Sequence, residues 1–184
     1  RFVTVTEPRV PELARLSRAM NAVVVRLKST FDEQSSQVEQ LRQQAHCDPL
    51  TGLSHRRYFM TQVGAELSKE EGSGSGVLYL IRLMDLAGVN RVLGHRTTDD
   101  LLQRLAKGIV EVSSGVSGAV HGRLNGGDLA VCLTTDDVPL PSAMDYADAL
   151  RQVFVQQAVN AAVVVGGVQW VRGTSLQQVL ATAD

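Results

Sequence analysis

The residues whose types and spacing could do chemistry are few, and the most informative of them surround a glycine-rich turn. Residues 123–133 read Arg-Leu-Asn-Gly-Gly-Asp-Leu-Ala-Val-Cys-Leu, so that one apolar run enters the turn and a second one leaves it. Asn and Gly tolerate the positive φ angles of a two-residue turn, and the pattern therefore predicts a β-hairpin. The turn carries one carboxylate, Asp128, and carboxylates of this kind can hold Mg²⁺. A purely structural hairpin is the alternative, and it is the one that we favour.

The remaining candidates for chemistry are thiols and imidazoles, and their spacing is uninformative. Cys47 and Cys132 are far apart in sequence, which is typical of small hydrophobic residues in a reducing compartment. The histidines show no metal-ligand spacing; they are His46, His55, His95 and His121. A formal charge of −1 provides no basic field for nucleic acid. We therefore expect no metal, no cofactor and no nucleic-acid partner.

Alternating helices and strands after residue 46 predict an α/β domain with helices packed on a central sheet. The expected helices cover residues 56–70, 97–112, 142–157 and 175–183. The expected strands cover residues 77–84, 119–124, 129–134 and 161–171, the last one interrupted at Gly166-Gly167. The Gly- and Ser-rich residues 72–76 are expected to form a flexible loop. A hydrophobic content of 44% supports a packed core.

A long helix is predicted from Glu12 to His46, because this stretch contains neither Gly nor Pro and Pro11 suits a first helical turn. Apolar or small residues follow a heptad seam: Leu13, Leu16, Met20, Val23, Leu27, Phe31, Gln34, Val38, Leu41 and Ala45. The seam is interrupted once, by a four-residue stutter between Leu27 and Phe31. The polar second half needs a partner, most simply the same helix of a second copy. Packing of the helix on its own domain is the alternative.

Several motifs after residue 46 occur together. Residues 48–59 read Asp-Pro-Leu-Thr-Gly-Leu-Ser-His-Arg-Arg-Tyr-Phe, and the hairpin follows 64 residues after residue 59. Both stretches resemble motifs of the GGDEF domain of diguanylate cyclases, the first departing only at His55, where that family has Asn. The hairpin corresponds to the pattern Arg-x-Gly-Gly-Asp/Glu-Glu-Phe. Its last five positions are filled by Asn125, Gly126, Gly127, Asp128 and Leu129.

Further matches extend this resemblance over about residues 46–184. Gly94-His95 with Asp99 matches a second helix motif, Asn90 matches a family Asn, and Ala183-Asp184 matches the start of a late motif. The resemblance implies a nucleotidyl-cyclase-like fold with a mainly antiparallel sheet flanked by helices. It also implies a domain related to enzymes that join two GTP molecules into cyclic di-GMP.

The resemblance implies that the metal site of these enzymes is lost here. In the family a carboxylate at the end of a strand binds Mg²⁺, and Arg82 takes its place. At about 4 Å and an effective dielectric constant of about 20, an arginine repels Mg²⁺ by roughly 8 kcal/mol. Later positions of the same motif are also changed, to Met84, Leu86 and Ala87. In the hairpin, Gly127 replaces one acid of the family. Asp128 replaces the family's Glu, so that it keeps the negative charge on a side chain that is one methylene shorter. We therefore expect a degenerate, catalytically inactive domain.

Other family sites are absent or reduced. Asp85 is the only nearby acid; it faces away from the lost metal position, and we expect it to cap the short helix that follows, with metal binding as the alternative. Val116 and Ala119 replace the Arg-x-x-Asp pair of the inhibitory site. Asn90 and Asp99 stand where the family reads guanine. Either a vestigial GTP site or a structural role is possible for these two residues.

The order of the segments suggests a signalling protein. Residues 1–30 resemble the end of a HAMP domain, residues 31–46 a signalling helix and residues 47–184 a degenerate GGDEF domain. The combination is similar to LapD-type cyclic di-GMP receptors of the inner membrane. It implies a cytoplasmic position, a homodimer through the signalling helix, a membrane segment upstream and an EAL domain downstream that binds cyclic di-GMP. The output would be a periplasmic one that controls biofilm adhesion.

Two other functions stay open at the level of sequence. One is a GTP-sensing regulatory domain of a phosphodiesterase. The other is an active diguanylate cyclase with unusual metal ligands.

Overall fold

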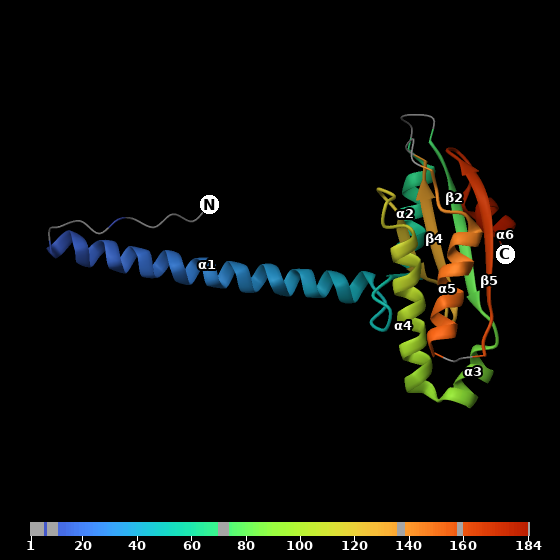
Figure 1. Ribbon diagram of the computed structural model, residues 1–184. Helices are drawn as coiled ribbons and strands as arrows, with labels where there is room; N and C mark the ends of the chain where they lie inside the picture. The colour runs from blue at the N-terminus through green and yellow to red at the C-terminus, as the bar shows by residue number, and fades with distance from the viewer. Residues whose placement is uncertain (1–5, 7–10, 70–73, 136–138, 158–159, 184) are drawn as a thin grey trace. The chain divides into compact units, whose positions relative to one another are not determined.

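The computed structural model describes residue 6 and residues 11–69, 74–135, 139–157 and 160–183. The chain divides into two compact units, residues 1–45 and residues 46–184. The first unit is formed by helix α1 (Pro11–His46), which is one unbroken helix of 36 residues (Figure 1). The prediction of a single long helix is therefore confirmed, with Pro11 at its first position. Among the described residues, no helix combines the length and the apolarity needed to cross a bilayer.

The second unit contains a five-stranded sheet in the order β1-β3-β4-β2-β5. The strands are β1 (Ser54–His55), β2 (Ser75–Leu83), β3 (Val120–Arg123), β4 (Asp128–Thr134) and β5 (Val163–Val171). Strand β1 runs parallel to β3 and every other pairing is antiparallel, so the expected mainly antiparallel sheet is confirmed. Strand β1 was not predicted, because a run of two residues is too short to carry an alternating pattern.

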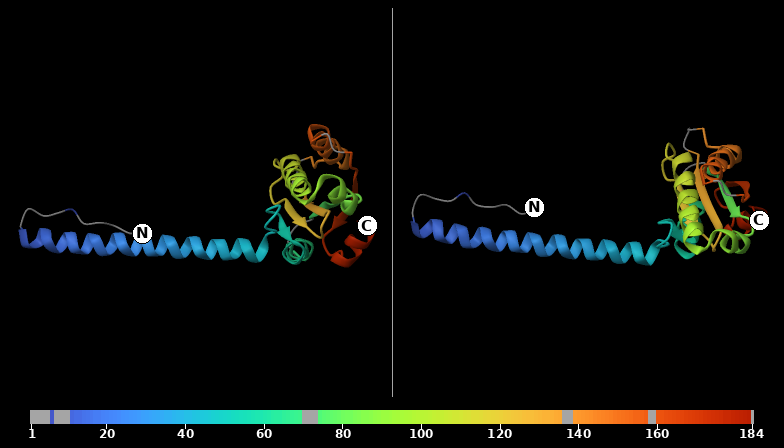
Figure 2. Two further views of the ribbon diagram at one scale, coloured as in Figure 1. Left: turned by 90° about the horizontal axis from the view of Figure 1, so that it is seen from below. Right: turned by 60° about the horizontal axis from the view of Figure 1, so that its bottom comes forward.

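Helices cover both faces of this sheet (Figure 2). They are α2 (Arg56–Leu67), α3 (Leu86–Leu93), α4 (His95–Val112), α5 (Ala143–Gln157) and α6 (Leu176–Ala183). Helices α4 and α5 bury their apolar residues against Ile81 and Val131 on one face. Helices α2 and α6 pack with Leu78 and Ala130 on the other face. The alternation of side chains along β2 and β4 thus supplies two cores from one sheet.

Strand β2 begins earlier than predicted, because Gly76 belongs to the sheet and not to a flexible loop. Gly76 pairs with Thr134 on one side and Trp170 on the other. A Cβ atom on Gly76 would overlap the carbonyl oxygen of Leu133 and lie 2.5 Å from Trp170 Cζ2. The glycine is therefore needed for close approach. The predicted loop residues Gly72 and Ser73 lie outside the described residues.

Strand β5 is continuous, and its predicted interruption at Gly166-Gly167 is wrong. These two glycines pair in register with Leu80 and Tyr79 of β2. A Cβ atom on Gly167 would lie 2.7 Å from Cε1 of the Tyr79 ring. The ring therefore occupies the space that a side chain would need, which explains a glycine inside a regular strand.

Helix boundaries differ from the predicted ones by a few residues, for reasons of capping. Ser142 and Ser175 stand just before α5 and α6, and each accepts a hydrogen bond from a backbone N–H three residues later. Helix α4 starts two residues early, at His95, directly after Gly94 with its φ of 79°. Helix α2 ends at Leu67.

Candidate functional site

The glycine-rich hairpin loop has a different conformation from the predicted two-residue turn. Four residues, 124–127, separate β3 from β4, and none of them has a positive φ angle. Both glycines of the loop are instead closely packed. A Cβ atom on Gly127 would lie 3.2 Å from the carbonyl oxygen of Leu83, and one on Gly126 would lie 3.0 Å from Leu86 Cδ2. The loop is therefore held against the end of β2 and the start of α3.

Arg82 at the end of β2 is paired with Asp128, the acid of the hairpin. Arg82 and Asp128 are direct partners in the register of β2 and β4. Arg82 Nε donates to Asp128 Oδ1 at 2.8 Å, with the two side chains 53% and 24% exposed. Asn125 Nδ2 donates to Asp128 Oδ2 at 3.3 Å. Both oxygens of the carboxylate are thus already engaged.

These residues do not fit a Mg²⁺ ion. A divalent cation requires several oxygen ligands, whereas here a guanidinium lies against the one carboxylate of the hairpin. Within the described ranges, no three His, Cys, Asp or Glu side chains are grouped so that they could hold a metal. Asp85 has a left-handed backbone (φ 45°) and accepts a hydrogen bond from Gly88 N at 3.0 Å, so its predicted role as the cap of α3 is confirmed.

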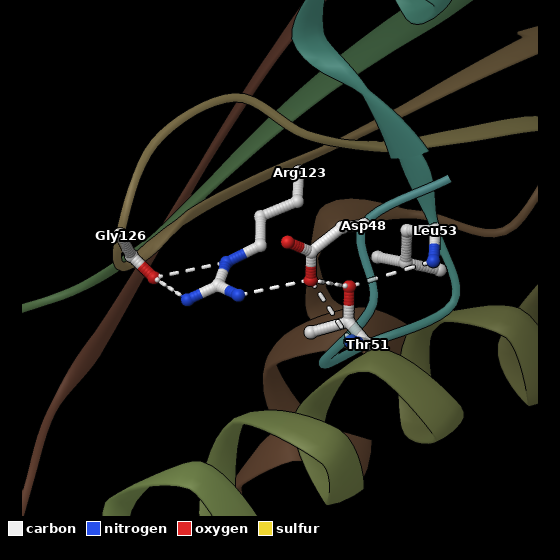
Figure 3. Close-up of polar contacts among 5 residues, drawn as sticks. All are labelled: Asp48, Thr51, Leu53, Arg123 and Gly126. Atoms are coloured by element: carbon white, nitrogen blue, oxygen red, sulfur yellow. Dashed lines mark hydrogen bonds and ion pairs between the residues drawn. The ribbon is translucent and has the colours of Figure 1, made fainter. Parts of the chain in front are cut away.

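A second polar cluster ties the hairpin to the segment that precedes α2 (Figure 3). Asp48 Oδ1 accepts hydrogen bonds from Arg123 Nη1 at 2.9 Å, from Thr51 N at 2.9 Å and from Thr51 Oγ1 at 2.8 Å. Arg123 also donates from Nε and Nη2 to the carbonyl oxygen of Gly126, at 3.2 and 2.8 Å. The cluster joins two motifs that lie 75 residues apart. We call these four residues the Asp48–Arg123 latch.

The hydrogen bonds of the latch lower the pKa of the Asp48 carboxyl group. Burial alone raises the pKa of Asp48, but the hydrogen bonds from Arg123 and Thr51 outweigh that effect, and the net pKa lies below the usual 3.8. The side chains of Asp48 and Arg123 are only 16% and 15% exposed, so solvent screens the pair less than a surface ion pair. Sequence reasoning placed both residues in motifs but did not pair them.

Two adjoining cavities lie beside the hairpin. The larger one, of about 550 Å³, is lined by Arg82, Asn125 and Asp128 together with an apolar wall from α2, β2 and α6. The smaller one, of about 340 Å³, lies over the latch and is lined by polar residues at the start of α2. Arg56, Leu124 and Asn125 line both cavities. Sequence reasoning did not identify Arg56 as a site residue.

The other predicted site residues lie elsewhere. Asn90 is on α3 and Asp99 on α4, and neither lines either cavity. Ala87 lies in the first turn of α3. Val116 and Ala119 are partly buried and pack against the core under α4 and α5. The structure therefore brings together Arg82, Asn125, Gly126, Gly127 and Asp128, whereas Asn90 and Asp99 do not line the same cavities.

A half-buried histidine predicts a dependence of stability on pH. His121 Nε2 lies 2.6 Å from Ser113 Oγ, and burial lowers the pKa of His121 below the ordinary 6.5. A lowered pKa means that the unfolded chain binds the proton more tightly, so this group stabilises the fold above pH 6.5. That contribution is lost as the pH falls through the folded pKa.

We expect a lower urea midpoint at about pH 5.5 than at about pH 7.5, with a smaller difference in the variant His121→Gln. If the urea midpoint falls equally in the variant and in the parent chain between the two pH values, groups other than His121 cause the pH dependence.

The comparisons with known proteins agree with this geometry. Residues 45–184 match the family described as "Diguanylate cyclase, GGDEF domain". The chain therefore belongs to the GGDEF domain family. It is 26% identical over 151 residues to the diguanylate cyclase DgcN of Escherichia coli (strain K12), which covers 82% of this chain and 36% of DgcN. The chain spans about half or less of the length of the curated relatives it matches.

Two solved structures show the same fold. One is the coiled coil and GGDEF domain of DgcB from Caulobacter crescentus in complex with c-di-GMP, with a TM-score of 0.68, 20% identity, and coverage of 90% of this chain and 91% of that one. The other is Vibrio cholerae LapD, comprising the S helix, GGDEF and EAL parts, with a TM-score of 0.68, 21% identity, and coverage of 84% and 36%.

Proposed function

We propose that this chain is a catalytically inactive GGDEF module that relays a signal within a cyclic di-GMP receptor. The observation that carries the proposal is the ion pair between Arg82 and Asp128. It neutralises the last acid of the hairpin at the position where a cyclase of this family holds its metal. The Asp48–Arg123 latch meanwhile ties the hairpin to the segment before α2 through hydrogen bonds. A site that keeps its shape without its metal ligands is suited to contacts rather than to turnover.

The proposal is tested by incubating the chain with GTP and Mg²⁺ and separating the products by liquid chromatography. We expect no cyclic di-GMP above the background of a reaction without protein, while DgcN of Escherichia coli serves as the positive control. Formation of more than one product molecule per chain would overturn the proposal.

The relay part of the proposal is supported by the apolar seam of α1. The large apolar seam residues are half or more exposed: Leu13, Leu16, Met20, Val23, Leu27, Phe31, Val38 and Leu41. An isolated helix with such a stripe gains free energy by pairing with an identical stripe. We propose that residues 1–30 end a HAMP domain and that residues 31–46 are the signalling helix of a homodimer. The matched LapD structure combines an S helix, a GGDEF domain and an EAL domain, and we propose by analogy that an EAL domain lies downstream here. We further propose that the chain belongs to the cytoplasmic side of an inner-membrane protein.

A charge in the seam is expected to separate the dimer. Leu41 is 64% exposed in the single chain and would be buried at the seam, so that Leu41→Asp places a carboxylate in an apolar interface. We expect the dissociation constant measured by analytical ultracentrifugation to rise by about a hundredfold or more.

Val25→Asp is the matched control, because Val25 is 61% exposed on the same helix but lies outside the seam. Equal association of the two variants, or a monomeric parent chain at high concentration, would contradict the coiled-coil dimer.

A further inference from the structure

We propose that strand β5 pairs edge to edge with β5 of a second copy of this chain, so that the two sheets join into one. Strand β5 is the last strand in the order β1-β3-β4-β2-β5, and among the described strands its one neighbour is β2 (Figure 1). This edge belongs neither to the hairpin nor to the apolar seam of α1. The inference therefore goes beyond the proposed function and does not depend on it.

The hydrogen bonds at the two ends of β5 show which of its backbone groups point outward. Met84 N donates to the carbonyl oxygen of Ala162 at 2.9 Å, just before β5 begins. Arg172 N donates to the carbonyl oxygen of Gly74 at 3.0 Å, just after β5 ends. In an antiparallel ladder, hydrogen-bonded pairs alternate with pairs that are not bonded. The even-numbered residues of β5 therefore bond to β2, and the odd-numbered residues direct their N–H and C=O groups away from the sheet: Val163, Val165, Gly167, Gln169 and Val171.

The outward backbone groups in the middle of β5 have no partner within the chain. Among the residues that the structure describes, no hydrogen bond reaches the outward N–H or C=O groups of Val165, Gly167 or Gln169. The carbonyl oxygen of Val171 differs, because Thr174 N donates to it at 3.1 Å. A row of unpaired backbone groups is a template for a further strand.

The sequence of β5 does not protect this edge. Natural sheets protect an open edge with a short strand, a charged residue, a proline or a bulge. The opposite edge strand, β1, has 2 residues, whereas β5 has 9 and contains neither a charged residue nor proline. All 9 pair with β2 in one uninterrupted register, without a bulge. Val164 and Val171 add apolar side chains that are 54% and 62% exposed. We therefore expect a further strand to cover this edge.

A second copy fits the edge because β5 is complementary to itself. Gly167 is the middle residue of β5, and a two-fold axis beside it places each outward residue opposite another outward residue. Val163 then faces the second copy's Val171, and Val165 faces the second copy's Gln169. No side chains collide at the axis, because Gly167 has none. No like charges oppose each other across the pair, since β5 carries no charge.

The test is amide hydrogen exchange of the full chain, resolved by residue with nuclear magnetic resonance, at two protein concentrations. The chain carries Leu41→Asp, which is designed to remove association through α1. A single strand edge is a small interface, so we expect a dissociation constant of about 0.1 mM. The outward amides of Gly167 and Gln169 should then exchange about threefold more slowly at about 1 mM than at about 50 μM protein. Because outward amides exchange from the folded chain, slower exchange requires a strand that covers them.

Gln169→Pro is the first variant, and Gln169→Thr is its matched control. The N–H of Gln169 points outward, so proline removes no hydrogen bond to β2 but places its ring where the second strand must approach. Threonine keeps the N–H group. We expect the exchange of Gly167 to remain dependent on concentration in Gln169→Thr and to lose that dependence in Gln169→Pro.

A second variant decides the question if the proline variant does not fold. Val171→Lys places a charge on the edge strand, which opposes pairing, at a side chain that is 62% exposed. Its control is Val110→Lys, because Val110 is 40% exposed on α4, a helix that covers a face of the sheet. We expect the concentration dependence to disappear in Val171→Lys and to persist in Val110→Lys.

The inference is overturned if the amide of Gly167 exchanges at the same rate at both concentrations in the Leu41→Asp chain, whether that rate is fast or slow. It is also overturned if a folded Gln169→Pro, or Val171→Lys in its place, keeps the concentration dependence. None of these outcomes bears on GTP turnover or on the seam of α1, which are tested separately.

Discussion

Alanine at Gly76 is expected to lower the free energy of unfolding of the domain by about 3 kcal/mol or more, at the upper end of what overpacking costs. The added methyl group would overlap the backbone oxygen of Leu133 and crowd the indole of Trp170, which is 2% exposed. Neither neighbour can move freely, because β2 is hydrogen-bonded to strands on both sides at this residue. The strain therefore falls on a strand that is paired on both sides.

The effect is measured by chemical denaturation followed by circular dichroism. Gly64→Ala is the control, since Gly64 lies inside α2 and a Cβ atom there meets nothing within 4 Å. That variant should be stabilised by about 0.5–1 kcal/mol through helix propensity. If Gly76→Ala proves as stable as the parent chain, the register of β2 between β4 and β5 is wrong.

Removal of the carboxylate of Asp48 is expected to cost about 2 kcal/mol of stability and to release the hairpin loop. The variant Asp48→Ala leaves Nη1 of Arg123 and both donors of Thr51 without their shared acceptor. The pair is mostly buried, so water replaces these bonds only in part. Because the folded pKa of Asp48 is lowered, its contribution is present above pH 3.8 and is lost as the pH falls through the folded value.

Hydrogen exchange gives the second readout for this latch. Exchange of the backbone amides of residues 124–127 should become faster in Asp48→Ala, because Arg123 no longer has a fixed position from which to hold Gly126. Asp148→Ala is the control: Asp148 makes an exposed pair with Arg151 at 3.6 Å, and such pairs contribute less than about 1 kcal/mol. Equal losses in both variants would show that the latch does not stabilise the hairpin.

Local patterns in the sequence were sufficient for most of the elements. The unbroken stretch after Pro11 predicted α1, and the alternating residues around 123–133 predicted β3 and β4. The glycines were misjudged in the hairpin, in β2 and in β5, because each one is explained by a neighbour that is distant in sequence. Trp170 occupies the space beside Gly76, and Tyr79 occupies the space beside Gly167. Neither neighbour can be inferred from the local sequence around the glycine.

The chemistry of the site was predictable only in part, for the same reason. The residue types at 82, 127 and 128 led to the expectation of a lost metal site, which stays a prediction. That Arg82 directly faces Asp128 depends on the register of β2 and β4, which pairs these two residues across 46 positions of the sequence. The position of Arg56 between two cavities likewise depends on how α2 packs beside the hairpin. Neither the pairing of Arg82 with Asp128 nor the position of Arg56 can be predicted from spacing along the chain.

Arg82 pairs with Asp128, and we therefore expect this carboxylate to be unavailable to a divalent cation. Electron paramagnetic resonance of Mn²⁺ tests this claim most directly, since binding removes the signal of the free ion. We expect the signal of free Mn²⁺ to be the same in the presence of the parent chain and of Asp128→Asn, because neither binds the ion at this position. The variant Arg82→Asp places two carboxylates opposite each other, and we expect it to bind the ion. Binding of Mn²⁺ by the parent chain that disappears in Asp128→Asn would contradict the account.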